Sequence, residues 1–144
     1  MHVRGTGEGM RTVGYLLIAA LLGGCSMSAD SKLAEQAVPE FHHMLDAAQF
    51  DVIYDGSADD LKRVATRKDF VDLLDAVHRK LGVVASSNQK TWKVNYNTSG
   101  SYVTLIYDTK YAEGDATEQF VYRLEIDKAL LAGYHINSNA LTLK

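Results

Sequence analysis

The sequence predicts an α+β fold in which helices come first and an antiparallel sheet follows. Between residues 31 and 81, apolar side chains recur every three or four positions, the period of a helix buried on one side. After Gly82 the period changes to two, which is typical of strands with one buried face. Short turns separate these strands, so neighbouring strands are antiparallel. Helices followed by such a meander form two layers, with the helices covering one face of the sheet.

Three helical segments are expected in the first half of the chain. Residues 31–48 carry an apolar stripe, although Pro39 removes one backbone donor and should kink the helix or delay its start. A short helix is expected over residues 59–65. The best-defined helix covers residues 67–81, where the apolar stripe is regular and Gly82 is placed to end it.

About four strands are expected in the second half, joined by turns rich in Gly, Asn and Asp. The segments that alternate between apolar and polar residues are 92–96, 102–111, 120–126 and 130–136. Residues 83–89 are a further candidate strand.

Composition limits the possible functions. The 144 residues suffice for one domain, and the formal net charge of −3 offers no general attraction for nucleic acid. A single cysteine excludes an internal disulfide and a multi-cysteine metal site. No phosphate-binding glycine loop follows a strand, so no cofactor is expected.

Residues 1–24 have the pattern of an export signal. Arg4 and Arg11 precede an apolar run from Val13 to Leu22. As a helix this run would be about 15 Å long, half of the roughly 30 Å hydrocarbon core of a bilayer. A basic flank, a short apolar run and a small-residue exit are typical of a secretory signal. Translation from Met1 or from Met10 leaves this pattern intact.

The exit of the apolar run, Leu22-Gly23-Gly24-Cys25, resembles the lipobox of bacterial lipoproteins. The resemblance implies that Cys25 is lipidated and becomes the first residue after cleavage, with residues 25–30 as a short tether to a domain over residues 31–144. Because Ser26 rather than aspartate follows, it also implies the periplasmic face of the outer membrane if the cell is Gram-negative. The alternative is an ordinary signal peptide followed by a free cysteine.

The mature part also resembles a known fold group over residues 31–139. The resemblance is carried by a helical half that ends at residues 69–82, the strand patterns 102–111 and 118–124, and the closing motif Leu131-Ala-Gly-Tyr-His-Ile-Asn137. These features are similar to small bacterial domains of unknown function with a cystatin-like or nuclear transport factor 2-like fold. The resemblance implies a curved sheet wrapped around helices, with a ligand or an active site in the concavity of some relatives. A fold alone does not assign a function.

Aromatic residues dominate the strand positions expected to face the helices. These residues are Tyr96, Tyr107, Tyr111, Phe120, Tyr122 and Tyr134. They could line a partly open pocket for an apolar or amphipathic ligand, or they could fill the core with their hydroxyls at its rim. Titratable groups are nearly missing from these positions, with Glu118 at the edge, which argues against general acid–base catalysis.

The opposite sheet face carries a mixture of apolar and polar residues. Its apolar members are Tyr102, Ile106, Val121 and Leu131. Such a face can be a contact surface for another protein, or its apolar residues can be ordinary scattered ones.

Two polar clusters are candidate metal sites, but neither has the required spacing. His42, His43 and Asp46 lack the His-Glu-x-x-His pattern, and His42 and Asp46 are expected to face water. The acidic residues Asp51, Asp55, Asp59 and Asp60 do not match a calcium-binding loop, so capping and a solvated surface are expected. No metal site is therefore predicted.

These observations leave two hypotheses for function. The first is a lipid-anchored envelope domain without catalytic activity that contacts another envelope protein or a second copy of itself. The second is a domain that binds, and could transform, a small molecule in an aromatic concavity between sheet and helices.

Overall fold

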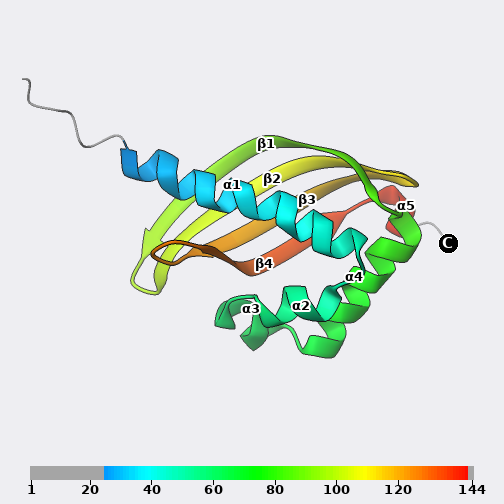
Figure 1. Ribbon diagram of the computed structural model, residues 1–144, viewed down its shortest axis with the longest axis horizontal. Helices are drawn as coiled ribbons and strands as arrows, with labels where there is room; N and C mark the ends of the chain where they lie inside the picture. Colours follow the sequence, from blue (N-terminus) through cyan, green and yellow to red (C-terminus); the bar gives the residue numbers. More distant parts are fainter. Residues whose placement is uncertain (1–24, 143–144) are drawn as a thin grey trace, which may run out of the picture.

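The computed structural model describes residues 25–142 and confirms the α+β prediction (Figure 1). In chain order the elements are α1 (Cys25–Asp46), α2 (Phe50–Asp55), α3 (Asp59–Val64), α4 (Arg67–Leu81), β1 (Val84–Asn97), β2 (Gly100–Tyr111), β3 (Gly114–Leu124), β4 (Ala129–Asn137) and α5 (Asn139–Thr142). The strands form one antiparallel sheet in the order β1-β2-β3-β4. The two candidate segments 83–89 and 92–96 belong to the single long strand β1.

The helices lie on one side of a curved sheet. Figure 1 shows α1 running across the concave face, with α2 and α3 beyond β4. The end of α4 packs where β2 turns into β3, because the backbone N–H of Glu113 donates to the carbonyl of Leu81 at 2.8 Å. The sheet therefore has a covered inner face and an outer face without a helical layer.

Helix α1 is longer than expected and begins earlier. It continues through Pro39 to Asp46, and residues 25–30, expected as a tether, form its first turns. Pro39 itself is exposed, so its ring needs no space in the core. The buried stripe consists of Ala34, Val38, Phe41 and Leu45, which are three or four residues apart and face the sheet.

Helix α4 has the ends that its sequence predicts. The hydroxyl of Thr66 accepts a hydrogen bond from the backbone N–H of Asp69 at 3.1 Å, which caps the first turn. Gly82 ends the helix with φ +76°, a conformation that favours glycine. A Cβ atom there would also lie 3.1 Å from the Cβ of Ala112. Gly82 therefore allows the chain to turn tightly into β1.

A β-bulge corrects the face predicted for Leu131. The pairing of β3 with β4 shifts between Val121 and Tyr122, so that Val121 lies opposite Gly133 and Tyr122 opposite Leu131. The extra residue, Ala132, reverses the alternation of side chains along β4. Leu131 therefore belongs to the core, with 6% of its surface exposed, rather than to the outer face.

The core lies between α1 and the concave face of the sheet. Phe120 at its centre is completely buried, and its ring centroid lies 5.1 Å from that of Phe41 on α1 and 5.3 Å from that of Tyr134 on β4. These edge-to-face and tilted contacts are favourable for aromatic pairs. The middle of the concavity is thus filled by α1 side chains.

Candidate functional site

A buried carboxylate lies in the middle of the covered sheet face. Glu118 on β3 has no exposed surface, and its two oxygens accept four hydrogen bonds. Oε2 accepts from His42 Nε2 at 2.7 Å and from the Thr109 hydroxyl at 2.6 Å. Oε1 accepts from the hydroxyls of Tyr111 and Tyr134, both at 2.6 Å. A buried charge of this kind is tolerated because every lone pair has a donor.

His42 contradicts the expectation that it faces water, since only 6% of its surface is exposed. It lies on α1 four residues after Val38 and three before Leu45, on the stripe that packs against the sheet. Asp46, also expected in water, is half-buried and accepts a hydrogen bond from the backbone N–H of Val84 at 3.1 Å. His43 is exposed, as a neighbour outside the stripe should be.

The pKa shifts around Glu118 fix the direction of its hydrogen bonds. Burial alone raises the pKa of Glu118, but the hydrogen bond and charge interaction with His42, helped by Thr109 and Tyr111, bring it below its ordinary value. The carboxylate is therefore ionised at neutral pH and only accepts, so His42 Nε2 donates. Burial, with Glu118 nearby, raises the pKa of Tyr111 and of Tyr134 well above the usual range, which keeps both hydroxyls as donors.

The network continues to the sheet edge. Thr109 uses its proton on Glu118, so it accepts the hydrogen bond that joins it to the Ser87 hydroxyl at 2.8 Å. The cluster thus links α1 to β1, β2, β3 and β4. With four donors on two oxygens, the carboxylate has no free lone pair for a substrate proton. Its hydrogen bonds instead connect helix α1 to the sheet.

Five of the six predicted pocket residues come together on the covered face. Tyr107, Tyr111, Phe120 and Tyr122 are buried, and Tyr134 is half-buried beside Glu118. Tyr96 lies apart near the start of α1, is 56% exposed and donates to Asp30 at 3.0 Å. The five residues surround packed side chains rather than one open central cavity.

Two clefts flank α1 instead. A cleft of about 390 Å³ lies between α1 and β1 and is lined by His42, Asp46, Ser87 and Tyr107 among others. A groove of about 320 Å³ lies between α1, α2 and β4, and Tyr122 forms part of its wall. Glu118 lines neither of them.

Three of the four acidic residues of the α2–α3 region form ion pairs. Asp51 and Asp55 both pair with Arg67 at the start of α4. Asp60 pairs with Arg63 at 2.6 Å and with Arg123 at 3.0 Å. Within residues 25–142, no three His, Cys, Asp or Glu side chains are placed to hold a metal ion together.

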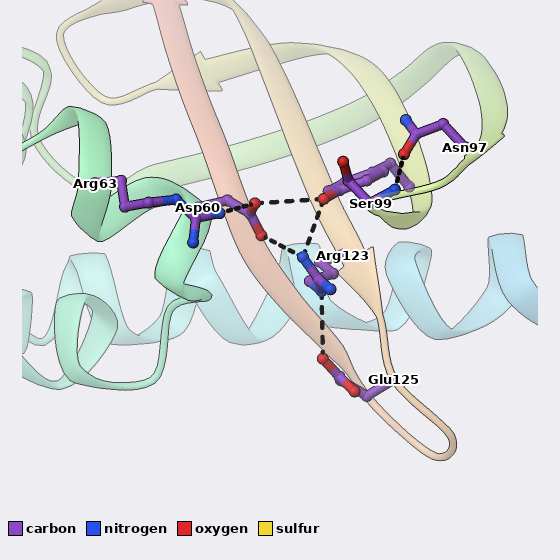
Figure 2. Close-up of polar contacts among 7 residues, drawn as sticks. Asp60, Arg63, Asn97, Ser99, Arg123 and Glu125 are labelled. Atoms are coloured by element: carbon purple, nitrogen blue, oxygen red, sulfur yellow. Dashed lines mark hydrogen bonds and ion pairs between the residues drawn. The ribbon is translucent and has the colours of Figure 1, made fainter.

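The outer sheet face carries a polar network at one end, shown in Figure 2. Arg123 Nη1 donates to Asp60 Oδ2 and to the Tyr102 hydroxyl, both at 3.0 Å, and its Nε lies 3.5 Å from Glu125. Its guanidinium also lies over the Tyr102 ring, 5.7 Å from the centroid. The hydrogen bond from Arg123 is the main cause that lowers the pKa of Asp60. Asp60 belongs to α3, which contacts β4, so this end of the outer face lies beside a helix.

The middle of the outer face is apolar and uncovered. Ile106 and Val121 are half-buried diagonal neighbours on β2 and β3. Gly133 lies opposite Val121 and has no side chain to cover it. Of the four residues predicted for this face, Tyr102, Ile106 and Val121 are there and Leu131 is not.

Sequence reasoning missed the pairing of His42 with Glu118. The alternation along β3 puts Glu118 on the inner face with Phe120 and Tyr122, at the edge of the aromatic set. The spacing of Phe41, Met44 and Leu45 defines a helical stripe that does not include His42. The spacing of Val38, His42 and Leu45 is equally helical and would have placed the imidazole inward.

Two expectations concern the N-terminal part. The predicted signal, residues 1–24, lies outside the described residues, and Cys25 is the first residue of α1. Within residues 25–142, no helix combines the length and apolarity needed to cross a bilayer.

Comparison with known proteins gives a fold neighbour and a family. A solved structure of a protein from Catenulispora acidiphila superposes with a TM-score of 0.53 at 16% sequence identity, over 81% of this chain and 96% of that one. At this identity the likeness concerns the fold alone. Curated protein sequences give no significant match. A family profile described as "Protein of unknown function (DUF4019)" matches residues 37–134, from the middle of α1 to Tyr134 on β4. Because this match covers well over half of the chain, the protein belongs to the DUF4019 family.

Proposed function

We propose that the protein is a lipid-anchored domain of the cell envelope that binds another protein through the outer face of its sheet and catalyses no reaction. The observation that carries this proposal is the outer face itself, which has an apolar centre at Ile106 and Val121 and no helix over it. Three further features each support a separate part of the proposal. They are the sequence around Cys25, the hydrogen bonds on both oxygens of Glu118, and the position of Arg123 beside the apolar centre.

The anchor is supported by the sequence around Cys25. A short apolar run ends at the lipobox-like Leu22-Gly23-Gly24-Cys25, and the chain has no second cysteine for a disulfide. Two or more acyl chains anchor a protein stably, at about 0.8 kcal/mol for each buried methylene. By this proposal the domain is exported and, in a Gram-negative cell, held at the periplasmic face of the outer membrane.

Binding rather than catalysis is supported by the state of Glu118. It is the most buried titratable group described, and His42, Thr109, Tyr111 and Tyr134 occupy both of its oxygens. A general base needs a free lone pair within reach of the substrate proton. The cluster instead stabilises the contact between α1 and the sheet.

Partner binding is supported by the side chains that border the apolar centre. Arg123 and Tyr102 lie next to Val121 and are held by Asp60 and Glu125 (Figure 2). Tyrosine and arginine are enriched among the residues that dominate protein–protein binding energy. Side chains that are already fixed lose little entropy when a partner binds.

The anchor is tested with a Cys25→Ser variant expressed from the full-length chain. The proposal expects the wild-type protein to stay with membranes at high salt and to carry the mass of diacylglycerol on Cys25. The variant should keep its signal segment and lose the lipid. If both proteins have the same unlipidated mass and the same membrane association, the anchor proposal is wrong.

The outer face is tested by photo-crosslinking in cells. A photoreactive residue replaces Gln119, which is exposed on this face opposite Ile106, and in a control it replaces Gln36, which is exposed on α1. We expect an adduct from position 119 that is absent from position 36 and is lost when Ile106→Asp is added. An adduct of twice the chain mass identifies a second copy, and another mass identifies a different partner. Equal labelling at both positions, or none at 119, overturns the proposal.

A further inference from the structure

Helix α1 leaves no flexible tether between the proposed lipid and the fold. The helix begins at Cys25 itself and continues to Asp46. A helix rises about 1.5 Å per residue, so Asp30 lies about 7.5 Å along the axis from Cys25. The headgroup layer on each side of a bilayer is about 5–8 Å thick. If Cys25 carries the lipid, the end of the domain around residues 25–30 therefore lies at the membrane surface.

Two hairpin turns lie at this end of the domain. The hydroxyl of Tyr96, next to the β1–β2 turn, donates to Asp30 at 3.0 Å and so joins that turn to the second turn of α1. The β3–β4 turn lies on the same side of the sheet, because Leu124 at the end of β3 pairs with Ser101 near the start of β2. Figure 1 shows both turns at the end of the sheet where α1 starts. A membrane surface at Cys25 therefore faces these two turns.

The tip of the β3–β4 turn carries an exposed isoleucine. The backbone N–H of Glu125 donates to the carbonyl of Lys128 at 2.8 Å, so Ile126 and Asp127 form the tip. The side chain of Ile126 is fully exposed and buries no surface against the core. Tight turns favour Gly, Pro, Asn, Asp and Ser, because these residues adopt turn conformations or form local hydrogen bonds. The turn itself thus gives no reason for a β-branched apolar residue, whereas a lipid surface gives one.

The other groups at this end indicate apolar rather than charged contact. Tyr96 is 56% exposed, and tyrosine is enriched where proteins meet the membrane interface because its ring is apolar and its hydroxyl polar. Recognition of anionic lipids typically uses clusters of about 4–8 Lys or Arg residues. The two turns, residues 97–100 and 125–128, contain one lysine and two acidic residues. A contact made by these turns therefore does not depend on anionic lipid.

We propose that the two turns and Tyr96 rest on the surface of the lipid bilayer and that Ile126 inserts between the lipid headgroups. This inference rests on the proposed anchor, because the lipid on Cys25 brings this end of the domain to the membrane. The strands then run away from the bilayer, and the outer sheet face stays free for a protein partner. Because apolar contact holds the turns, they should bind zwitterionic phosphatidylcholine.

The test measures how close the β3–β4 turn comes to the headgroups in the anchored protein. The full-length chain with Asp127→Cys is expressed, lipidated and labelled with a fluorophore at residue 127. Since Cys25 is the only natural cysteine and its sulfur is acylated, the label attaches at one position. The protein is reconstituted in phosphatidylcholine vesicles that contain nitroxide-labelled headgroups. We expect several-fold stronger quenching than for the same label at Glu113→Cys, on the exposed β2–β3 turn at the opposite end of the sheet.

Two substitutions of exposed β-branched residues show whether Ile126 makes the contact. Ile126→Asn in the protein labelled at residue 127 should lower the quenching several-fold, while the lipid still holds the protein on the vesicles. Val83→Asn is the matched control, because Val83 is also exposed but precedes the start of β1 at the opposite end of the sheet. It should leave the quenching unchanged. Adding phosphatidylglycerol to the vesicles should change neither result.

The outcomes separate this inference from the anchor. The bilayer contact is wrong, and the anchor stands, if the lipidated protein is quenched equally at positions 127 and 113. The same holds if the quenching persists in Ile126→Asn or requires phosphatidylglycerol. An intact mass without lipid on Cys25 overturns both proposals.

Discussion

Glu118 on β3 and His42 on α1 are 76 residues apart in the sequence and are joined by a 2.7 Å hydrogen bond in the core. It is the only bond between the side chains of α1 and the buried carboxylate within residues 25–142. Tyr111, Tyr134 and Thr109 donate to the remaining positions on Glu118. The pair is therefore a polar contact between α1 and the sheet, beside the apolar stripe of the helix.

Replacing Glu118 with Gln should destabilise the fold strongly. The amide N–H₂ would face a donor where the carboxylate now accepts, and the remaining partners would lose their charge-assisted bonds. Breaking a buried, hydrogen-bonded pair costs about 3–5 kcal/mol, which urea denaturation can measure. Glu125→Gln is the matched control, since Glu125 is exposed and its contact with Arg123 is 3.5 Å long. If Glu118→Gln lowers the free energy of unfolding no more than the control does, Glu118 does not stabilise the contact between α1 and the sheet.

The same carboxylate predicts a pH dependence of stability. The pKa of Glu118 is lower in the folded protein than its ordinary value of 4.5, so the unfolded chain binds this proton first. The stabilisation is therefore complete above pH 4.5 and is lost as the pH falls through the lowered pKa. Unfolding free energies measured between pH 3 and pH 7 should fall toward acid. Glu118→Gln should remove part of that slope, and an unchanged slope would show that other groups cause it.

Leu131→Asp should destabilise the fold far more than Ile106→Asp. Leu131→Asp places a carboxylate in the core beside Tyr122, so we expect a loss of at least about 3 kcal/mol. Ile106→Asp changes a half-buried residue of the open face and should stay within about 1 kcal/mol. Thermal unfolding of both variants tests the bulge at Ala132, because without the bulge Leu131 would be the surface residue.

Removing the hydroxyl of Tyr122 should stabilise the free protein. Tyr122→Phe deletes a buried hydroxyl without a partner, which we expect to raise the free energy of unfolding by about 1 kcal/mol. Tyr134→Phe makes the same chemical change but deletes a bond to Glu118, and it should cost about 2 kcal/mol. Opposite signs in chemical denaturation are the expected result, and a loss for both variants would mean that Tyr122 has a partner in solution.

Replacing Arg123 with Gln should raise the pKa of Asp60 but change the free energy of unfolding only slightly. The hydrogen bond from Arg123 is the main cause of the lowered pKa of Asp60, so that pKa should rise in the variant. The pairs are partly exposed, so the free energy of unfolding should change by at most about 1 kcal/mol. Carboxyl NMR titration measures the pKa, with Asp72 on α4 as a distant reference. An unchanged titration of Asp60 would mean that the network in Figure 2 is not populated.

The elements could be predicted from local patterns because local contacts form them. The stripe from Phe70 to Leu81 and the glycine that ends it are visible in the sequence, as is the alternation along β2 and β3. The bulge at Ala132 could not be predicted, since the extra residue is defined only by the pairing with β3. That single shift explains the wrong face for Leu131.

The cluster around Glu118 and His42 depends on tertiary packing, which local sequence patterns do not contain. A histidine beside an apolar stripe is compatible with water or with the core, and the choice depends on whether a partner lies opposite. Here the partner is Glu118, on a strand that follows 76 residues later.

The course of α1 has a mechanical consequence. The helix extends about 33 Å from Cys25 to Asp46, and His42 lies in its last turns. A force applied at residue 25 is therefore carried along the helix axis to the bond with Glu118. Since α1 lies across the strands, that force loads the contact in shear, with many side chains resisting together, and does not peel them apart one by one. We therefore expect the fold to resist tension applied at its N-terminal end.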